Sequence, residues 1–242
     1  MDTTPSTWSQ HVAERMRVLI VAGVLTGVVV AGIGSRLAML LLRVTSSERV
    51  IGVTSDDGFN IGKVTVGGTY SLLMLGAAVG IIGAAAYRLV APWLIGPTWL
   101  RRLTTALASG AVVGSMLVHA DGVDFTLLTP TWLAIGTFVA LPALFGGVIG
   151  IVVDSVAGPT SWTRRGKRQW LVPLICVAFF PVTLFFLAFM LIAVGLWALA
   201  RDTDFPAEVR SVKVAALAVR ALWLAIAVAG LAALLNDIRA IA

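Results

Sequence analysis

The sequence predicts an all-α integral membrane protein with six transmembrane helices, arranged as three hairpins with both termini cytoplasmic. Hydrophobic residues make up 59% of the 242 residues and charged residues 12%, whereas a soluble domain carries about 25% charged residues. Most of the apolar runs can cross a bilayer core of about 30 Å, which needs roughly 20 residues at 1.5 Å each. The six runs cover residues 18–42, 70–90, 103–119, 132–153, 170–200 and 214–235. Their short connections predict a single polytopic membrane domain over residues 1–242.

The first run follows a polar stretch that ends in Arg15 and Arg17, and it is longer than the apolar region of a signal peptide. We therefore expect it to remain as a span. Arg36 lies inside this run, about 27 Å along the helix from Val18 at 1.5 Å per residue. Its side chain either reaches the outer interface or pairs with an acid there. At about 100° per residue, Arg36 lies opposite Gly27 on an α-helix, so the two residues should face different neighbours.

Four of the runs contain a GxxxG motif, which places two glycines on one face of a helix. Lipid tails are as apolar as side chains, so transmembrane helices associate through the close approach of small residues. The motifs therefore predict a compact core of spans one to four, and contact between two copies of the chain is an alternative role for one of them. The glycine pairs are Gly23/Gly27, Gly76/Gly80, Gly110/Gly114 and Gly146/Gly150.

The connections carry two further patterns. Residues 50–54 and 61–66 are rich in β-branched side chains and flank Asp56-Asp57-Gly58, which predicts a β-hairpin, with an irregular surface loop as the alternative. The inner connections after the second and fourth runs both contain Gly-Pro-Thr, a tryptophan and two arginines. Duplication of a helical hairpin would produce this repeat, and so would the residues that any inner membrane boundary uses.

A polar cluster follows the third run, where His119, Asp121 and Asp124 lie within six residues. Carboxylate oxygens and an imidazole can together ligate a divalent cation. The spacing matches no EF-hand or zinc pattern, however, and Asp-Gly is also ordinary turn chemistry. Two hypotheses therefore stand for this segment: a polar site at the outer boundary, or a plain turn at the end of a helix.

The last two runs differ from the first four. The fifth covers 31 residues and contains Pro173 and Pro181, so a helix over it must tilt, kink or project beyond the bilayer. In the sixth, Arg220 and Trp223 share a helix face at positions i and i+3. Arg220 is predicted in the outer half of the membrane, and Trp223 near the midplane against a neighbouring helix.

Positive charges set the predicted orientation. With the N-terminus cytoplasmic, the inner segments hold ten Lys and Arg residues and the outer segments six. Because cytoplasmic loops carry the excess of these residues, both termini are predicted in the cytoplasm. Arginine outnumbers lysine 15 to 3 amid abundant alanine, valine and glycine. This composition resembles that of a high-GC bacterial genome, so we expect the plasma membrane of a bacterium.

The sequence contains no HExxH, GxSxG or Walker A motif. We therefore expect no catalytic site, no cofactor and no resident metal, and topology explains the net charge of +6 without nucleic-acid binding. The first functional hypothesis is a non-enzymatic accessory or assembly subunit of a larger membrane complex, in contact with lipid and with other subunits or a second copy of itself.

Two alternatives remain open. One is a small transporter or channel with an outward-facing acidic entrance, and the other is a lipid-modifying enzyme built on the histidine and acids after the third run. The candidate polar residues at the outer boundary are Arg36, His119, Asp121, Asp124 and Arg220.

Overall fold

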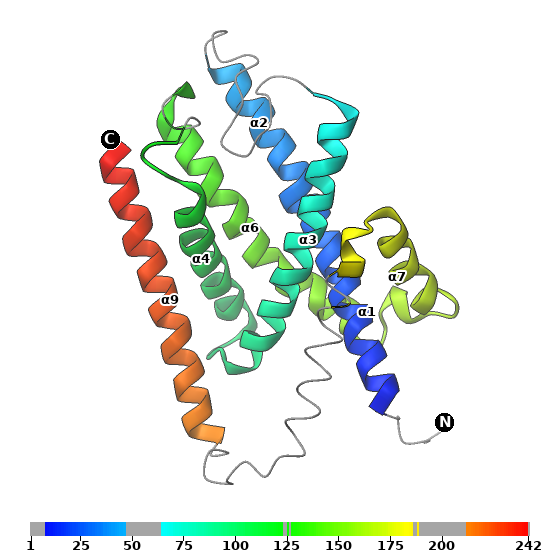
Figure 1. The fold of residues 1–242 in the computed structure, drawn as a ribbon. Helices are drawn as coiled ribbons and strands as arrows, with labels where there is room; N and C mark the ends of the chain where they lie inside the picture. Colours follow the sequence, from blue (N-terminus) through cyan, green and yellow to red (C-terminus); the bar gives the residue numbers. More distant parts are fainter. Residues whose placement is uncertain are drawn as a thin grey trace.

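The chain folds into a bundle of tilted helices (Figure 1) in a computed structural model that describes residues 8–46, 64–122, 125, 127–185, 188 and 212–241. Within these residues the protein is all-helical and has no strand, as the sequence predicts. The elements are α1 (Trp8–Thr26), the π-helix η1 (Gly27–Ile33), α2 (Gly34–Thr45), α3 (Val66–Val90), η3 (Ala91–Trp93), α4 (Thr98–Leu117), α6 (Thr131–Ala157), η4 (Trp162–Arg164), α7 (Arg168–Phe179) and α9 (Val212–Ile241). The predicted β-hairpin lies almost wholly outside the described residues.

Among the residues that the structure describes, four helices are long and apolar enough to cross a membrane. They cover Val12–Thr45, Val66–Trp93, Thr131–Arg164 and Leu217–Ile241, and they correspond to the first, second, fourth and sixth predicted spans. The third predicted span is α4, which has 20 residues but carries Arg101 and Arg102 in its first turns and is not among the four. The apolar helices indicate a membrane-embedded protein.

The GxxxG motif of α1 and η1 packs directly on that of α3. A Cβ atom added to Gly76 would lie 2.6 Å from the carbonyl oxygen of Gly27. One added to Gly80 would lie 2.8 Å from the Cα of Gly27 and would also clash with the carbonyl oxygen of Gly23. In return, one added to Gly23 would lie 2.6 Å from the Cα of Ile81. Real Cβ atoms do not approach other atoms so closely, so only glycine at these motif positions allows the two backbones to meet as they do.

The other two glycine motifs lie at contacts of α6. Gly110 and Gly114 on α4 face Ala143 and Val139 of α6, and Gly146 faces Ser109 of α4 in return. Gly150 lies against the ring and hydroxyl of Tyr87 on α3. All eight motif glycines thus contact helices of the same chain, which leaves none of the four motifs as a free face for a second copy.

The fifth predicted span is not one continuous helix. α7 ends at Phe179, and the backbone of Phe180 leaves the helical region with φ −126° and ψ 77°. Proline has no N–H to donate and disfavours helical geometry in the residue before it, so Pro181 ends the helix here. The sequence predicts that a helix here would tilt, kink or project beyond the bilayer, whereas the structure shows that the helix ends at Phe179. Residues 189–211 lie outside the described part of the chain.

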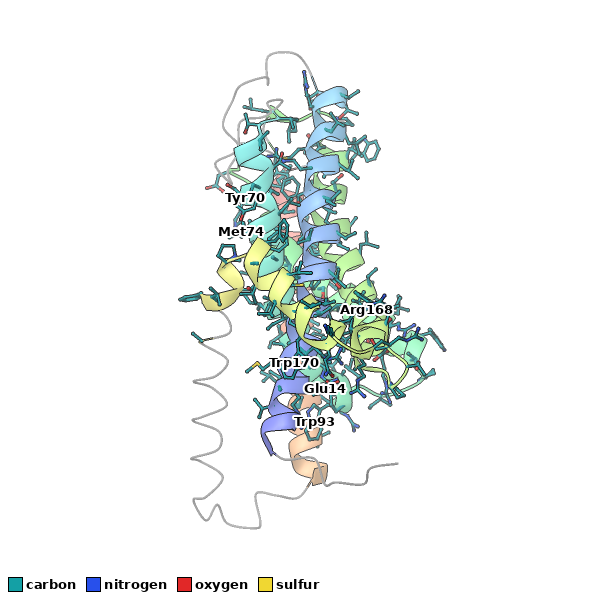
Figure 2. All side chains as sticks on the ribbon, turned by 90° about the vertical axis from the view of Figure 1, so that its right-hand side faces the viewer. Glu14, Tyr70, Met74, Trp93, Arg168 and Trp170 are labelled. Carbon is teal, nitrogen blue, oxygen red and sulfur yellow. The ribbon has the colours of Figure 1, made fainter. Side chains whose placement is uncertain are left out.

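The last helix runs in the direction opposite to the prediction. Near its start, Arg220 bonds to Trp93 at the end of α3, and near its finish Leu234 packs with Leu42 and Val118. α1 begins and α9 ends at opposite ends of the bundle (Figure 1). We call the end with Arg17, Arg88, Arg102 and Arg164 the basic end; Figure 2 shows Glu14 and Trp93 toward it and Tyr70 farther away.

Candidate functional site

A cavity of about 500 Å³ runs along the bundle between α3 and α4. α3 packs on α1 and η1, whereas α4 packs on α6 and α9, so these two neighbouring helices barely contact each other. The cavity extends from Leu42 and Leu128 at one end to Tyr87 and Leu94 at the basic end. Its volume falls in the range of roughly 300–1,000 Å³ that is typical of ligand pockets.

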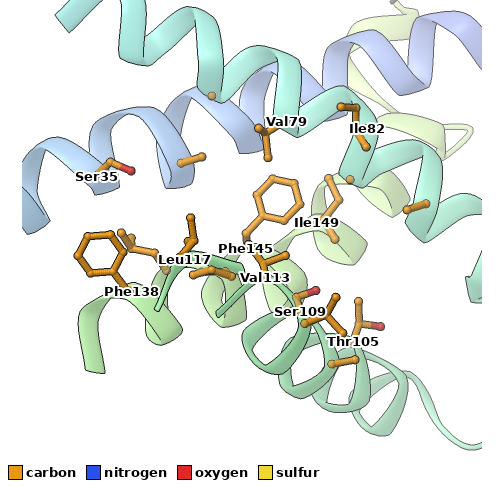
Figure 3. Close-up of a pocket in the computed structure, with 18 of the residues that line it drawn as sticks. Ser35, Val79, Ile82, Thr105, Ser109, Val113, Leu117, Phe138, Phe145 and Ile149 are labelled. Carbon is orange, nitrogen blue, oxygen red and sulfur yellow. The ribbon is translucent and has the colours of Figure 1, made fainter. Parts of the chain in front are cut away.

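Large apolar side chains form the walls. Figure 3 shows Val79 and Ile82 of α3 on one side, Ser109 and Val113 of α4 on the other, and Phe145 of α6 between them. Ile82 is 53% exposed and Val113 is 37% exposed. The cavity is therefore a groove that opens between α3 and α4 rather than a sealed void, and in a bilayer this opening would face lipid.

Two of the five residues with hydroxyl groups that line the cavity donate to carbonyls of their own helices. Thr105 donates to the carbonyl of Arg101 at 2.7 Å, and Thr137 donates to that of Leu133 at 2.7 Å. No charged residue is among the lining residues. Because most of the lining is aliphatic or aromatic, it offers a ligand mainly van der Waals contact, which suits hydrocarbon better than a polar solute.

The glycine motif of α3 packs on α1 and η1, although Ala31 of η1 also reaches the groove. Gly76 is among the residues that line the groove, whereas Gly80, one turn further along the same helix, is not. Gly80 is fully engaged by its contacts with Gly23 and Gly27 on the other side of α3. The predicted packing glycines therefore position the wall of the groove and, apart from Gly76, take no part in its lining.

The basic end of the cavity is different, because Arg88 follows Tyr87 in the last turn of α3, and Arg101 and Arg102 lie in the first turns of α4. Arg102 forms an ion pair with Asp154 at 3.3 Å. Arg88, Arg101, Arg102 and Asp154 all act electrostatically on the Tyr87 hydroxyl. The apolar groove therefore ends beside three arginines and one carboxylate.

A second polar network lies at the same end of the bundle but outside the cavity. Arg17 is only 5% exposed, and it donates to Glu14 at 2.6 Å, to the carbonyl of Val156 at 3.2 Å and to the hydroxyl of Thr163. Arg164 also bonds to Glu14. These bonds tie α1 to the segment that follows α6, so we assign the network a structural role.

Arg36, the first residue of the predicted polar site, lies against α3. Its guanidinium is 2.9 Å from where a Cβ of Gly68 would be. Gly27 also packs on α3, so the prediction that Arg36 and Gly27 face different neighbours is wrong. The reason is η1: the i→i+5 bonds of a π-helix widen each turn and advance the chain by fewer degrees per residue than an α-helix does.

The remaining predicted residues do not form one site. His119 and Asp121 are exposed in the turn after α4, and Asp124 lies outside the described residues. Among the described residues, no three His, Cys, Asp or Glu side chains come close enough to hold a metal. Arg220 donates from Nε to the carbonyl oxygen of Trp93 at 2.8 Å. It therefore lies at the basic end of the bundle, away from His119 and Asp121 at the far end of α4.

Sequence reasoning missed the cavity, although Trp223, which the sequence predicts against a neighbouring helix, contributes to its lining. No single residue type marks the groove in the sequence, because it arises where two helices fail to pack. No family model, curated protein or solved structure matches this chain. Its geometry therefore has to support any functional conclusion.

Proposed function

We propose that this chain is a non-enzymatic integral membrane protein that binds an acyl chain of a membrane lipid in the cavity between α3 and α4. The observation that supports the proposal is an apolar groove of about 500 Å³ whose lining has no charged residue. A groove of this chemistry that opens toward lipid is filled by hydrocarbon, because a strongly polar occupant would find few partners in a lining that is mostly aliphatic and aromatic.

We further propose that the basic end faces the cytoplasm of a bacterium. Eleven of the fourteen Lys and Arg residues in the described part of the chain belong to this end, and the positive-inside rule orients such an end inward. The other three are Arg36, Arg43 and Arg239. Because α9 starts at the basic end, this orientation replaces the predicted third hairpin and places the end of α9 outside.

A pair of variants on one helix tests the binding proposal. Val113→Trp fills the groove, whereas Leu107→Trp adds the same bulk at a residue that is 63% exposed and does not line the groove. The full chain in mild detergent is incubated with dioleoyl phosphatidylcholine, and native mass spectrometry measures the lipid-bound fraction. We expect Val113→Trp to weaken binding by about tenfold, or about 1.4 kcal/mol, and Leu107→Trp to leave it unchanged. Equal binding by both variants would exclude the groove as the site.

The accessory-subunit role stays a prediction, and the same preparation tests it. If the role is correct, mild detergent should preserve a second protein in stoichiometric amount. A purified protein that carries lipid but no protein partner would count against the accessory-subunit role.

A further inference from the structure

We propose that the lipid bound between α3 and α4 is an anionic phospholipid, whose phosphate is held by the arginines at the basic end of the cavity. This inference rests on the proposed function and adds the class of headgroup to it. An acyl chain of the lipid would occupy the apolar groove, and the headgroup would lie where the groove meets the membrane surface beside Tyr87.

The first argument is the position of the charges relative to the groove. Tyr87 lines the groove, Arg88 follows it in the last turn of α3, and Arg101 and Arg102 lie in the first turns of α4. These are the same two helices whose separation creates the groove. A lipid chain between them would therefore bring its phosphate to their basic ends.

The second argument is the charge balance. Three arginines face one carboxylate, Asp154, which forms its ion pair with Arg102. Arg101 uses its Nε to bond the carbonyl oxygen of Gly96 at 2.9 Å, a neutral acceptor that leaves its charge uncompensated. The cluster thus keeps a net positive charge, and basic pockets between transmembrane helices on the cytoplasmic side are suited to anionic headgroups.

A fourth arginine adds to this field from α9. Arg220 bonds the carbonyl oxygen of Trp93, and the next residue, Leu94, lines the groove. Trp223, one turn further along α9, lines it as well. α9 therefore adds apolar wall and positive charge at the same end.

The third argument concerns selectivity. The bilayer is as apolar as the groove, so moving a chain from bulk lipid into the groove gains only packing contacts. Burial of an acyl chain in the groove cannot by itself distinguish between two phospholipids that have the same acyl chains. Any preference must come from the headgroup, and the three arginines near Tyr87 outnumber the one carboxylate, Asp154, so the balance of charge there favours an anion.

The test compares two lipids with identical chains, dioleoyl phosphatidylglycerol and dioleoyl phosphatidylcholine. The full chain is exposed to equal amounts of each in mild detergent, and native mass spectrometry gives the ratio of the two bound forms. The key variant is Arg88→Gln with Arg101→Gln, which leaves the ion pair between Arg102 and Asp154 intact. Its control is Arg165→Gln with Arg168→Gln, which removes the same charge from exposed positions at the same end.

We expect the unaltered protein to prefer phosphatidylglycerol. Because a basic residue near the surface contributes about fivefold to binding of anionic lipid, the key variant should lower this preference by about tenfold or more, and the control by less than twofold. Equal loss in both variants would mean a diffuse surface charge and would overturn the inference. Equal binding of both lipids by the unaltered protein, together with weakened binding by Val113→Trp, would overturn the headgroup assignment alone. Lipid binding that Val113→Trp leaves unchanged would overturn the proposed function.

Discussion

Arg220 donates a hydrogen bond from Nε to the backbone carbonyl oxygen of Trp93 at 2.8 Å, across 127 residues of sequence. The bond joins the third turn of α9 to the last residue of η3, which directly follows α3. It fixes where α9 begins, because the end of α3 lies at the basic end of the bundle. The direction of the last helix, and with it the side on which the chain finishes, follows from this contact.

The first prediction concerns topology. Because α9 starts at the basic end, an epitope tag placed before Trp8 and one placed after Ile241 should lie on opposite sides of the membrane. Protease treatment of sealed, right-side-out vesicles should remove only the tag after Ile241, and detergent should then expose the other. Two tags that are protected together, or cleaved together, would restore the even number of spans that the sequence predicted.

The second prediction concerns the contact between η1 and α3. Gly76→Ala should destabilise the protein, because the new Cβ would lie 2.6 Å from the Gly27 carbonyl oxygen and 2.8 Å from the Gly32 nitrogen. We expect a loss of about 1–3 kcal/mol, the usual effect of overpacking. Gly136→Ala is the control, since a Cβ there meets nothing within 4 Å and should add about 0.5–1 kcal/mol by helix propensity. The unfolding temperature in detergent should therefore fall for Gly76→Ala and rise for Gly136→Ala. A shift in the same direction for both variants would contradict the packing of η1 on α3.

The third prediction concerns the buried arginine of α1. Arg17→Met should lower the free energy of unfolding by about 2 kcal/mol or more, because hydrogen bonds to charged groups contribute about 1.5–3 kcal/mol each. Arg15→Met is the matched control on an exposed position of the same helix and should change stability by less than about 0.5 kcal/mol. Similar unfolding temperatures for the two variants would show that Arg17 does not hold α1 to the segment after α6.

The sequence predicts where most of the helices lie better than it predicts which helices contact one another. Apolar length predicted helices at the positions of α3, α4, α6 and α9, and α3 begins four residues early because Thr65 caps it by accepting a hydrogen bond from the Gly68 nitrogen at 3.1 Å. The GxxxG spacing identified residues that lie at helix contacts, since two glycines four residues apart share one helix face. The structure was needed to show which motif packs on which helix, such as Gly80 against Gly23 and Gly27.

Other features could not be predicted from local sequence. The turn of η1 depends on how Gly27 and Gly32 fit against α3, and this tertiary contact rotates Arg36 toward that helix as well. The direction of α9 is seen from a contact distant in sequence, the bond of Arg220 to Trp93, and the fifth apolar run, which reads as one span, is interrupted at Pro181. The groove depends on α3 and α4 packing on other partners, so no residue along the chain marks it.

The most direct test of the lipid-binding groove is a crosslinking map. Phosphatidylglycerol with a diazirine in its acyl chain is bound to the full-length protein in detergent, and excess lipid is removed. Light then crosslinks the acyl chain of the retained lipid to the nearest residues of the protein. Peptide mass spectrometry should then place the label on groove residues of facing helices, such as Val79, Val113 and Phe145. Label confined to outward-facing residues, such as Leu107 on α4 or Leu224 on α9, which are both 63% exposed, would contradict the account.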